Sequence, residues 1–236
     1  MTGSANATIN SGGMAFYIEG GASSNIATEL SSLVGSSGSG NKLNITMNSG
    51  SNLIRWNAPT GGSINLSSIS SLSSSIANVT VTGSNYNTLS INKGELVIDE
   101  NVALTGTGNA YNGVEMSQSK VTLASGYNIT GALDGQIGIA QINPGTLSDV
   151  SITNNGTITL SGKKSTGLAL DHGYITNTGT IEVTNPGITG EGSLGIFSAN
   201  DTVTVNNGAI NVSGIESVGI YGANDFVAGT PASYGT

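Results

Sequence analysis

Apolar and polar residues alternate along much of the chain, in phrases such as TVTVNN and GTITLSG. An alternation with a period of two is typical of a β-strand that buries one face. In the phrase NNGTITL, the side chains of Ile158 and Leu160 therefore share one face, and those of Thr157 and Thr159 share the other. The pattern predicts a short strand after each Asn-Gly pair, with its apolar residues turned inward.

Two unequal phrases recur in turn along the second half of the chain. One begins at an Asn-Gly or Asn-Thr-Gly turn and the other is a glycine followed by apolar residues; their glycines are Gly156, Gly167, Gly179, Gly195, Gly208 and Gly219. A full cycle takes 23 to 29 residues, a length typical of solenoid repeats. Weaker copies occur earlier, at Gly12, Gly50, Gly94, Gly113 and Gly138. Because asparagine and glycine tolerate positive φ, we predict left-handed backbone at the turns.

The distance between the last apolar residue and the turn differs among the copies. Ile152 and Ile175 lie four residues ahead of the turn glycine, whereas Ile91 and Val205 lie three residues ahead. A β-bulge or a changed turn at the two shorter copies would explain the difference.

The regular recurrence favours coils stacked on one another over hairpins, which prefer two-residue turns, and over a sandwich, which would not repeat a phrase. We predict an all-β fold, a right-handed parallel β-helix with two strands per cycle, internal apolar ladders and hydrogen-bonded asparagine ladders at its corners. Residues 89–236 form the regular coils. Residues 1–88 form a less regular region, with a short helix over residues 25–34 and strand and loop, rather than helix, over residues 63–83.

Composition narrows the possible functions. Charged residues make up 8% of the chain and the net charge is −8, with five lysines and one arginine that never cluster. A basic patch for nucleic acid cannot be built from them, so we expect no nucleic-acid partner. No apolar run reaches the length of a membrane-spanning helix, and we expect no membrane contact. Cysteine is absent and histidine occurs once, so we expect no zinc centre and no cofactor.

Three stretches carry a family resemblance: TNNGTITLSG with STGLAL, TNTGTIEVTN with GSLGIF, and VNNGAINVSG with ESVGIYGAND. They resemble the passenger region of bacterial autotransporters, in particular the very large fusobacterial adhesins of the type V secretion class. The resemblance covers roughly residues 89–221. It implies a β-helical rod exposed on the bacterial cell surface, at the outer membrane, and part of a longer protein. It also implies attachment to host cells or other bacteria through a cell-surface glycan or protein receptor, without catalysis.

Loops and unusual surface residues are the candidates for ligand binding, because the repeat residues themselves are structural. Two Asn-Pro-Gly insertions lengthen the spacing between phrases, and NLIRWNAPTGG contains the only tryptophan next to the only arginine. The tryptophan either contributes to a surface site or fills the end of the rod. The ligand-binding candidates are therefore Arg55, Trp56, Asn143, Pro144, Asn185 and Pro186.

An enzyme that hydrolyses or cleaves polysaccharides is the alternative function, because β-helices also house such enzymes, and these need paired carboxylates. Asp201 and Asp225 follow the second phrase at equivalent places, in SANDT and GANDF, and would stack about 5 Å apart on successive coils, near enough for paired acids or a metal ion. Asn-Asp is also a common turn pair. His172 follows Asp171 directly, and adjacent strand residues face opposite sides, so we expect no catalytic hydrogen bond between them unless the chain forms a loop there. We place the histidine in a turn between coils and assign no catalytic residue.

Overall fold

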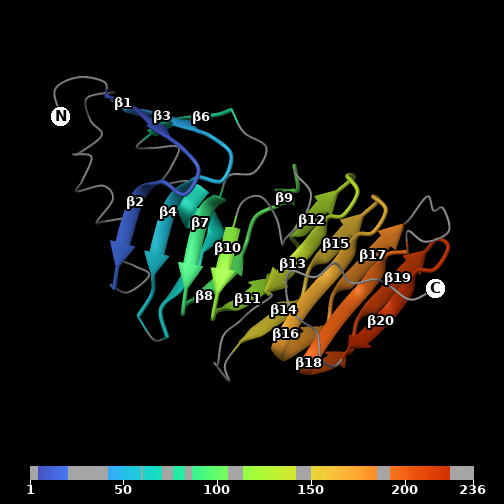
Figure 1. Cartoon of the computed structure of the whole chain (residues 1–236). Helices are drawn as coiled ribbons and strands as arrows, with labels where there is room; N and C mark the ends of the chain where they lie inside the picture. Colours follow the sequence, from blue (N-terminus) through green and yellow to red (C-terminus); the bar gives the residue numbers. More distant parts are fainter. Residues whose placement is uncertain are drawn as a thin grey trace. The chain divides into compact units, whose positions relative to one another are not determined.

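The computed structural model describes residues 5–20, 42–59, 61–70, 77–82, 87–105, 114–141, 150–184 and 192–223 (Figure 1). The regular secondary structure of this part of the chain is almost entirely β-strand, and the strands pair in parallel. The all-β prediction is confirmed. Among the described residues, no helix has the length and apolar character needed to cross a membrane.

The chain divides into two compact units. Unit 1 contains Met1–Val97 with Asn112–Met116, and unit 2 contains Ile98–Tyr111 with Ser117–Thr236. The boundary predicted at residue 88 concerns the regularity of the repeats. The division into compact units is a different property and does not test that boundary.

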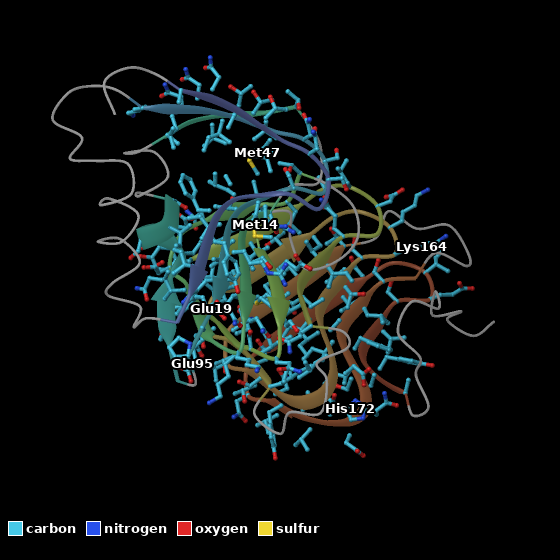
Figure 2. The ribbon with its side chains drawn as sticks, turned by 60° about the vertical axis from the view of Figure 1, so that its left-hand side comes forward. Met14, Glu19, Met47, Glu95, Lys164 and His172 are labelled. Atoms are coloured by element: carbon cyan, nitrogen blue, oxygen red, sulfur yellow. The ribbon has the colours of Figure 1, made fainter. Side chains whose placement is uncertain are left out.

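Unit 1 contains two small parallel sheets and one further strand pair (Figure 1). The three-stranded sheet has the order β1 (Asn6–Ile9), β3 (Leu43–Met47), β6 (Ala77–Val81). The four-stranded sheet has the order β10 (Val114–Ser117), β7 (Asn87–Asn92), β4 (Asn52–Asn57), β2 (Met14–Glu19), and β5 (Ser63–Asn65) pairs with β8 (Glu95–Ile98). The side chain of Met47 reaches from β3 into the interior of the unit, where it is fully buried (Figure 2).

One prediction about unit 1 is wrong in part. A helical turn at residues 66–70 follows β5, where we expected strand and loop. Leu66 and Ile69 lie three positions apart and are both buried, so packing of one helix face outweighs the poor helix propensity of the serines between and after them. The helix expected at residues 25–34 lies outside the described residues.

Each repeat of unit 2 contributes three strand segments, not the predicted two. The segments after the Asn-Gly turn are β9 (Val102–Ala103), β12 (Asn128–Gly131), β15 (Thr157–Leu160), β17 (Thr180–Thr184) and β19 (Ala209–Ser213), which form one sheet in that order. The segments before the turn are β11 (Lys120–Leu123), β14 (Ser151–Asn154) and the second halves of β16 (Thr166–Asn177) and β18 (Leu194–Asn206). Each pairs with the next in that order. The segments of the second phrase are β13 (Ile137–Gln141), the first halves of β16 and β18, and β20 (Val218–Ala223). The third segment exists because the residues ahead of each turn alternate as well.

Equivalent residues of consecutive repeats lie opposite one another. Ile129, Ile158, Ile181 and Ile210 form one such column, and Leu160, Val183 and Val212 form the next. The columns are fully buried except at Ile210 and Val212, in the last described copy. Thr157 and Thr159 are half-buried on the other face of the same strand, so the predicted inward and outward faces are confirmed.

An asparagine ladder runs beside these columns, as predicted. The side-chain amide of Asn154 donates to Oδ1 of Asn177 at 2.7 Å, and that of Asn177 donates to Oδ1 of Asn206 at 2.6 Å. Asn154 and Asn177 are fully buried, so the ladder satisfies polar groups that water cannot reach.

At the turns of unit 2, glycine is needed for a reason other than the predicted one. Gly156, Gly179 and Gly208 do not have positive φ, and neither do the residues before them. A Cβ on Gly179 would instead collide with the carbonyl oxygen of Gly156 in the preceding repeat, and one on Gly208 would collide with that of Gly179. The turn glycines of unit 2 therefore allow consecutive repeats to approach closely, and the prediction of left-handed turns is wrong at these positions. It is confirmed at two early copies, where Gly12 has a φ of 76° and Gly50 a φ of 74°.

The irregular spacing before the turn has a different cause at each copy. Thr204 lies opposite the buried Ile175, and Val205 faces outward with 46% of its surface exposed. Threonine thus occupies the inward position, and the bulge expected there is wrong. Ile91 is itself buried, and the turn after it contains Lys93 at a φ of 65°, so the changed turn is confirmed at this copy.

Candidate functional site

The predicted surface pair Arg55 and Trp56 lies on β4, where the two side chains point to opposite faces. Trp56 is fully buried, its register partners are Ile18 and Ile91, and its indole Nε1 donates to the carbonyl oxygen of Gly20 at 3.2 Å. The prediction that Trp56 contributes to a surface site is therefore wrong, because strand alternation places it in the core of unit 1.

Arg55 lies on the outer face of the four-stranded sheet, on β4 between β2 and β7. Its register partners are Tyr17 on β2, which is 50% exposed, and Ser90 on β7. Among the described residues, the guanidinium makes no ion pair and no hydrogen bond. The exposed guanidinium thus has an exposed aromatic ring on one side and a serine on the other.

A row of polar side chains crosses the same face two residues further along the strands. Glu19, at the end of β2 (Figure 2), lies opposite Asn57, which lies opposite Asn92. The amide nitrogen of Asn92 donates to Oδ1 of Asn57 at 2.9 Å. The bond occupies the oxygen of the Asn57 amide and leaves its nitrogen as a donor, two residues along the strand from Arg55.

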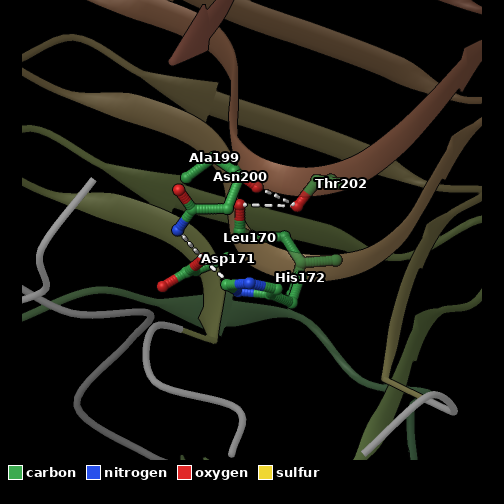
Figure 3. Close-up of polar contacts among 6 residues, drawn as sticks. All are labelled: Leu170, Asp171, His172, Ala199, Asn200 and Thr202. Atoms are coloured by element: carbon green, nitrogen blue, oxygen red, sulfur yellow. Dashed lines mark hydrogen bonds and ion pairs between the residues drawn. The ribbon is translucent and has the colours of Figure 1, made fainter. Parts of the chain in front are cut away.

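A second group of polar residues lies at the bend in the middle of β16 (Figure 3). Nδ1 of His172 lies 2.5 Å from Oδ1 of Asp171, and the side-chain amide of Asn200 donates to the same oxygen at 2.5 Å. The carboxylate of Asp171 is buried, whereas 47% of the His172 side chain is exposed. The contact occurs in the case left open from the sequence, in which the chain does not run as a strand at His172.

The backbone at the bend explains this contact. His172 has a φ of 60° and Asn200 a φ of 49°, and the register between β16 and β18 shifts between Asp171 and Gly173. The chain therefore leaves the extended conformation at His172, and the rule that adjacent side chains face opposite sides does not apply. The hydroxyl of Thr202 closes the same bend from β18, 2.6 Å from the carbonyl oxygen of Ala199.

The bend orients one imidazole. When Nδ1 of His172 carries its proton, it donates to Asp171, and Nε2 then faces outward as an acceptor. An imidazole oriented by a buried carboxylate is the arrangement of a general base. Among the described residues, no group of three or more histidines and carboxylates could hold a metal ion.

Of the remaining candidates, only Asp201 lies among the described residues. Asp201 is exposed beside the bend, and its predicted stacking partner Asp225 lies outside the described residues, as do the insertion residues Asn143, Pro144, Asn185 and Pro186. Their ligand-binding or metal-binding roles stay predictions. Comparisons with family models, curated proteins and solved structures give no match to the chain.

Sequence reasoning missed Tyr17, although a signal for it exists. Tyr17 and Arg55 each lie five residues after an early turn glycine, Gly12 and Gly50, and each precedes a buried residue. Aligning those two early copies would have placed the tyrosine beside the arginine. The contact between Asp171 and His172 carries no such signal, because it depends on one positive φ.

Proposed function

We propose that the chain is a stretch of right-handed parallel β-helix that serves, without catalysis, as an adhesin segment on the bacterial cell surface. It holds a rigid rod together and attaches through its outer face and loops to host cells or to other bacteria. The observation that carries the proposal is the in-register pairing of equivalent residues in consecutive repeats, from Ile129 to Ile210.

The use of the repeat residues supports this proposal. The inward residues of each copy form columns, and the asparagines form ladders, so both contribute to stacking. The outward residues of the repeats are mostly threonine, serine and asparagine, which suit a solvated rod with few charges. A ligand is then recognised by the residues that depart from the repeat. The resemblance of the repeat phrases to autotransporter passengers points to the same role.

Direct attachment tests the proposed function. The purified chain, labelled with a fluorophore, is incubated with epithelial cells and with several bacterial species, and bound fluorescence is measured by flow cytometry. Saturable binding that unlabelled chain displaces is expected on at least one cell type. If every cell type shows only linear, non-displaceable binding, the chain is not an adhesive segment.

A polysaccharide-cleaving enzyme is the second candidate function, and the contact of His172 with buried Asp171 favours it, because the pair resembles an oriented general base. The chain is incubated with acidic and neutral polysaccharides, and new reducing ends and unsaturated products are measured. Turnover that disappears in Asp171→Asn, with an unchanged circular dichroism spectrum, would support catalysis and displace the adhesin proposal.

A further inference from the structure

We propose that the outer face of β2, β4 and β7 binds an acidic sugar, with Arg55 holding the carboxylate or sulfate group and Tyr17 contacting the sugar ring. This inference rests on the proposed adhesive function and names the ligand class and the site. Both residues lie in unit 1 and are direct register partners.

The guanidinium of Arg55 is the anchor. It is the only arginine in a chain of net charge −8, it lies on β4, an interior strand of the four-stranded sheet, and it is exposed. Among the described residues no carboxylate neutralises it. Guanidinium groups form paired hydrogen bonds with planar carboxylates and with sulfate or phosphate oxygens, which gives both energy and orientation.

Tyr17 supplies the second contact. Neighbouring strands lie about 4.8 Å apart, so the ring of Tyr17 and the guanidinium border one area about as wide as a sugar ring. Half of the tyrosine is exposed, and it offers an apolar ring face together with a hydroxyl group. A sugar has the matching pattern, because its ring carries an apolar face of C–H groups and a rim of hydroxyls.

The neighbouring row of polar side chains contains one residue that favours the binding of an anionic ligand and one that opposes it. The Asn57 amide, held by its bond from Asn92, presents donors to the hydroxyl or acidic group of a ligand. Glu19 lies opposite Asn57 and is exposed, so its negative charge weakens the binding of any anion at Arg55. Neutralising Glu19 is therefore expected to strengthen binding, a change of opposite sign to the loss of Arg55.

The size and charge of the site favour a sugar over a macromolecule. A stable protein interface uses roughly 20–30 residues on each side, far more than the few that surround Arg55. Binding to nucleic acid requires several cations along the phosphate backbone, whereas this face carries one. Charge complementarity and size together select a small anionic sugar unit at the end or in the middle of a glycan chain.

A glycan array with sialylated, uronic-acid-containing, sulfated and neutral glycans tests the inference, followed by calorimetry with the strongest ligand. Arg55→Gln is expected to weaken binding about tenfold or more, the usual effect of losing a hydrogen bond to a charged group. Arg55→Lys keeps the positive charge but cannot form the paired hydrogen bonds of a guanidinium. Its affinity is therefore expected to lie between those of the unchanged chain and Arg55→Gln. Tyr17→Ala also weakens binding, and Glu19→Gln strengthens it.

Matched variants separate the site from general effects. Lys164 is an exposed cation of unit 2 (Figure 2) with a φ of 55°. Lys164→Asn removes one positive charge, as Arg55→Gln does, and asparagine tolerates the positive φ. Tyr174 is 55% exposed, which makes Tyr174→Ala the control for Tyr17→Ala. Neither control is expected to change glycan binding. The emission of buried Trp56 reports whether unit 1 remains folded in each variant.

The outcomes are distinct. Binding to sialylated, uronic or sulfated glycans that depends on Arg55 supports the inference and identifies the source of the acidic group. Binding to neutral glycans alone, no glycan binding, or an equal loss in Lys164→Asn overturns it. If Arg55→Gln attaches to cells as well as the unchanged chain does, the inference fails while the proposed adhesive function stands. If the unchanged chain attaches to no cell, the adhesive function fails.

Discussion

Replacement of Asn177 by alanine tests the energetic role of the buried asparagine ladder. Asn177 accepts a hydrogen bond from Asn154 and donates one to Asn206. Asn154 is fully buried, so its amide nitrogen would lose its acceptor where no water can replace it. Asn206 is exposed, and its oxygen regains a bond to water.

The expected cost follows from this difference. A buried donor without a partner costs about 1–3 kcal/mol, whereas the solvated end of the ladder contributes little. With a urea m-value of about 1–3 kcal/mol/M, the unfolding midpoint of unit 2 falls by about 1 M. In the double variant Asn154→Ala/Asn177→Ala, the orphaned donor is gone as well, so the double change costs less than the sum of the two single changes.

Unit 1 offers a matched control. Asn44 donates to Asn6 and accepts from Asn78, which is the same pair of bonds on a half-buried residue, where the bonds are open to solvent. Asn44→Ala is therefore expected to change stability by less than about 0.5 kcal/mol. The two variants differ in burial and not in the number of hydrogen bonds lost.

Urea unfolding followed by two signals separates the units. Far-ultraviolet circular dichroism reports on the strands of both units, and the emission of Trp56, the only tryptophan, reports on unit 1 alone. Asn177→Ala should lower the transition seen by circular dichroism and leave the tryptophan transition in place. Equal effects of Asn177→Ala and Asn44→Ala would refute the reasoning, because burial would then not decide the cost.

Three further predictions test close packing, backbone strain and register by urea unfolding. Gly167→Ala is expected to destabilise unit 2 by about 2 kcal/mol or more, because the new Cβ would lie 2.5 Å from a backbone oxygen. Gly219→Ala is expected to be nearly neutral, because its Cβ would have no neighbour closer than 4.0 Å. Similar losses of stability in the two variants would contradict the packing argument. His172→Val is expected to be less stable than His172→Gly by about 1–2 kcal/mol, because both lose the imidazole and only valine opposes the positive φ; equal stabilities would show that the bend relaxes. Ile175→Ser is expected to cost about 3 kcal/mol and Val205→Ser almost nothing, and the reverse order would mean that Val205 is the inward residue.

The sequence predicted the part of the fold that depends on short-range alternation. Ile158 and Leu160 could be placed inward, and their parallel pairing with later copies could be expected, because each copy repeats the same period of two. The third strand segment of each repeat was missed. The inward position of Thr204 was also missed, because threonine is neither apolar enough to mark a buried position nor polar enough to exclude one. At the turns, the sequence required glycine but could not distinguish positive φ from close approach.

The candidate site was predictable only where the chain departs from its repeat. Arg55 was conspicuous because arginine occurs once, but its partner could not be known without the register that brings Tyr17 opposite to it. For Trp56 the sequence left a surface site and an interior position open. The structure selects the interior position, because an alternating strand that exposes Arg55 must bury the next residue.

A repetitive chain of this kind separates stability from recognition. Residues that occur in every copy, such as Ile158 and Ile181, must fit their equivalents above and below, so a change in one copy disturbs its neighbours in the stack. Tyr17, Arg55 and Ser90 occupy equivalent positions in consecutive strands but are three different residues, so no ladder requires any of them. Arg55 and Tyr17 lie on the solvent side of strands whose inner side is fixed by Ile54 and Trp56. Substitution of the outer pair is therefore expected to alter binding with little effect on folding. The same outer face can acquire a different specificity without any change in the ladders that support it.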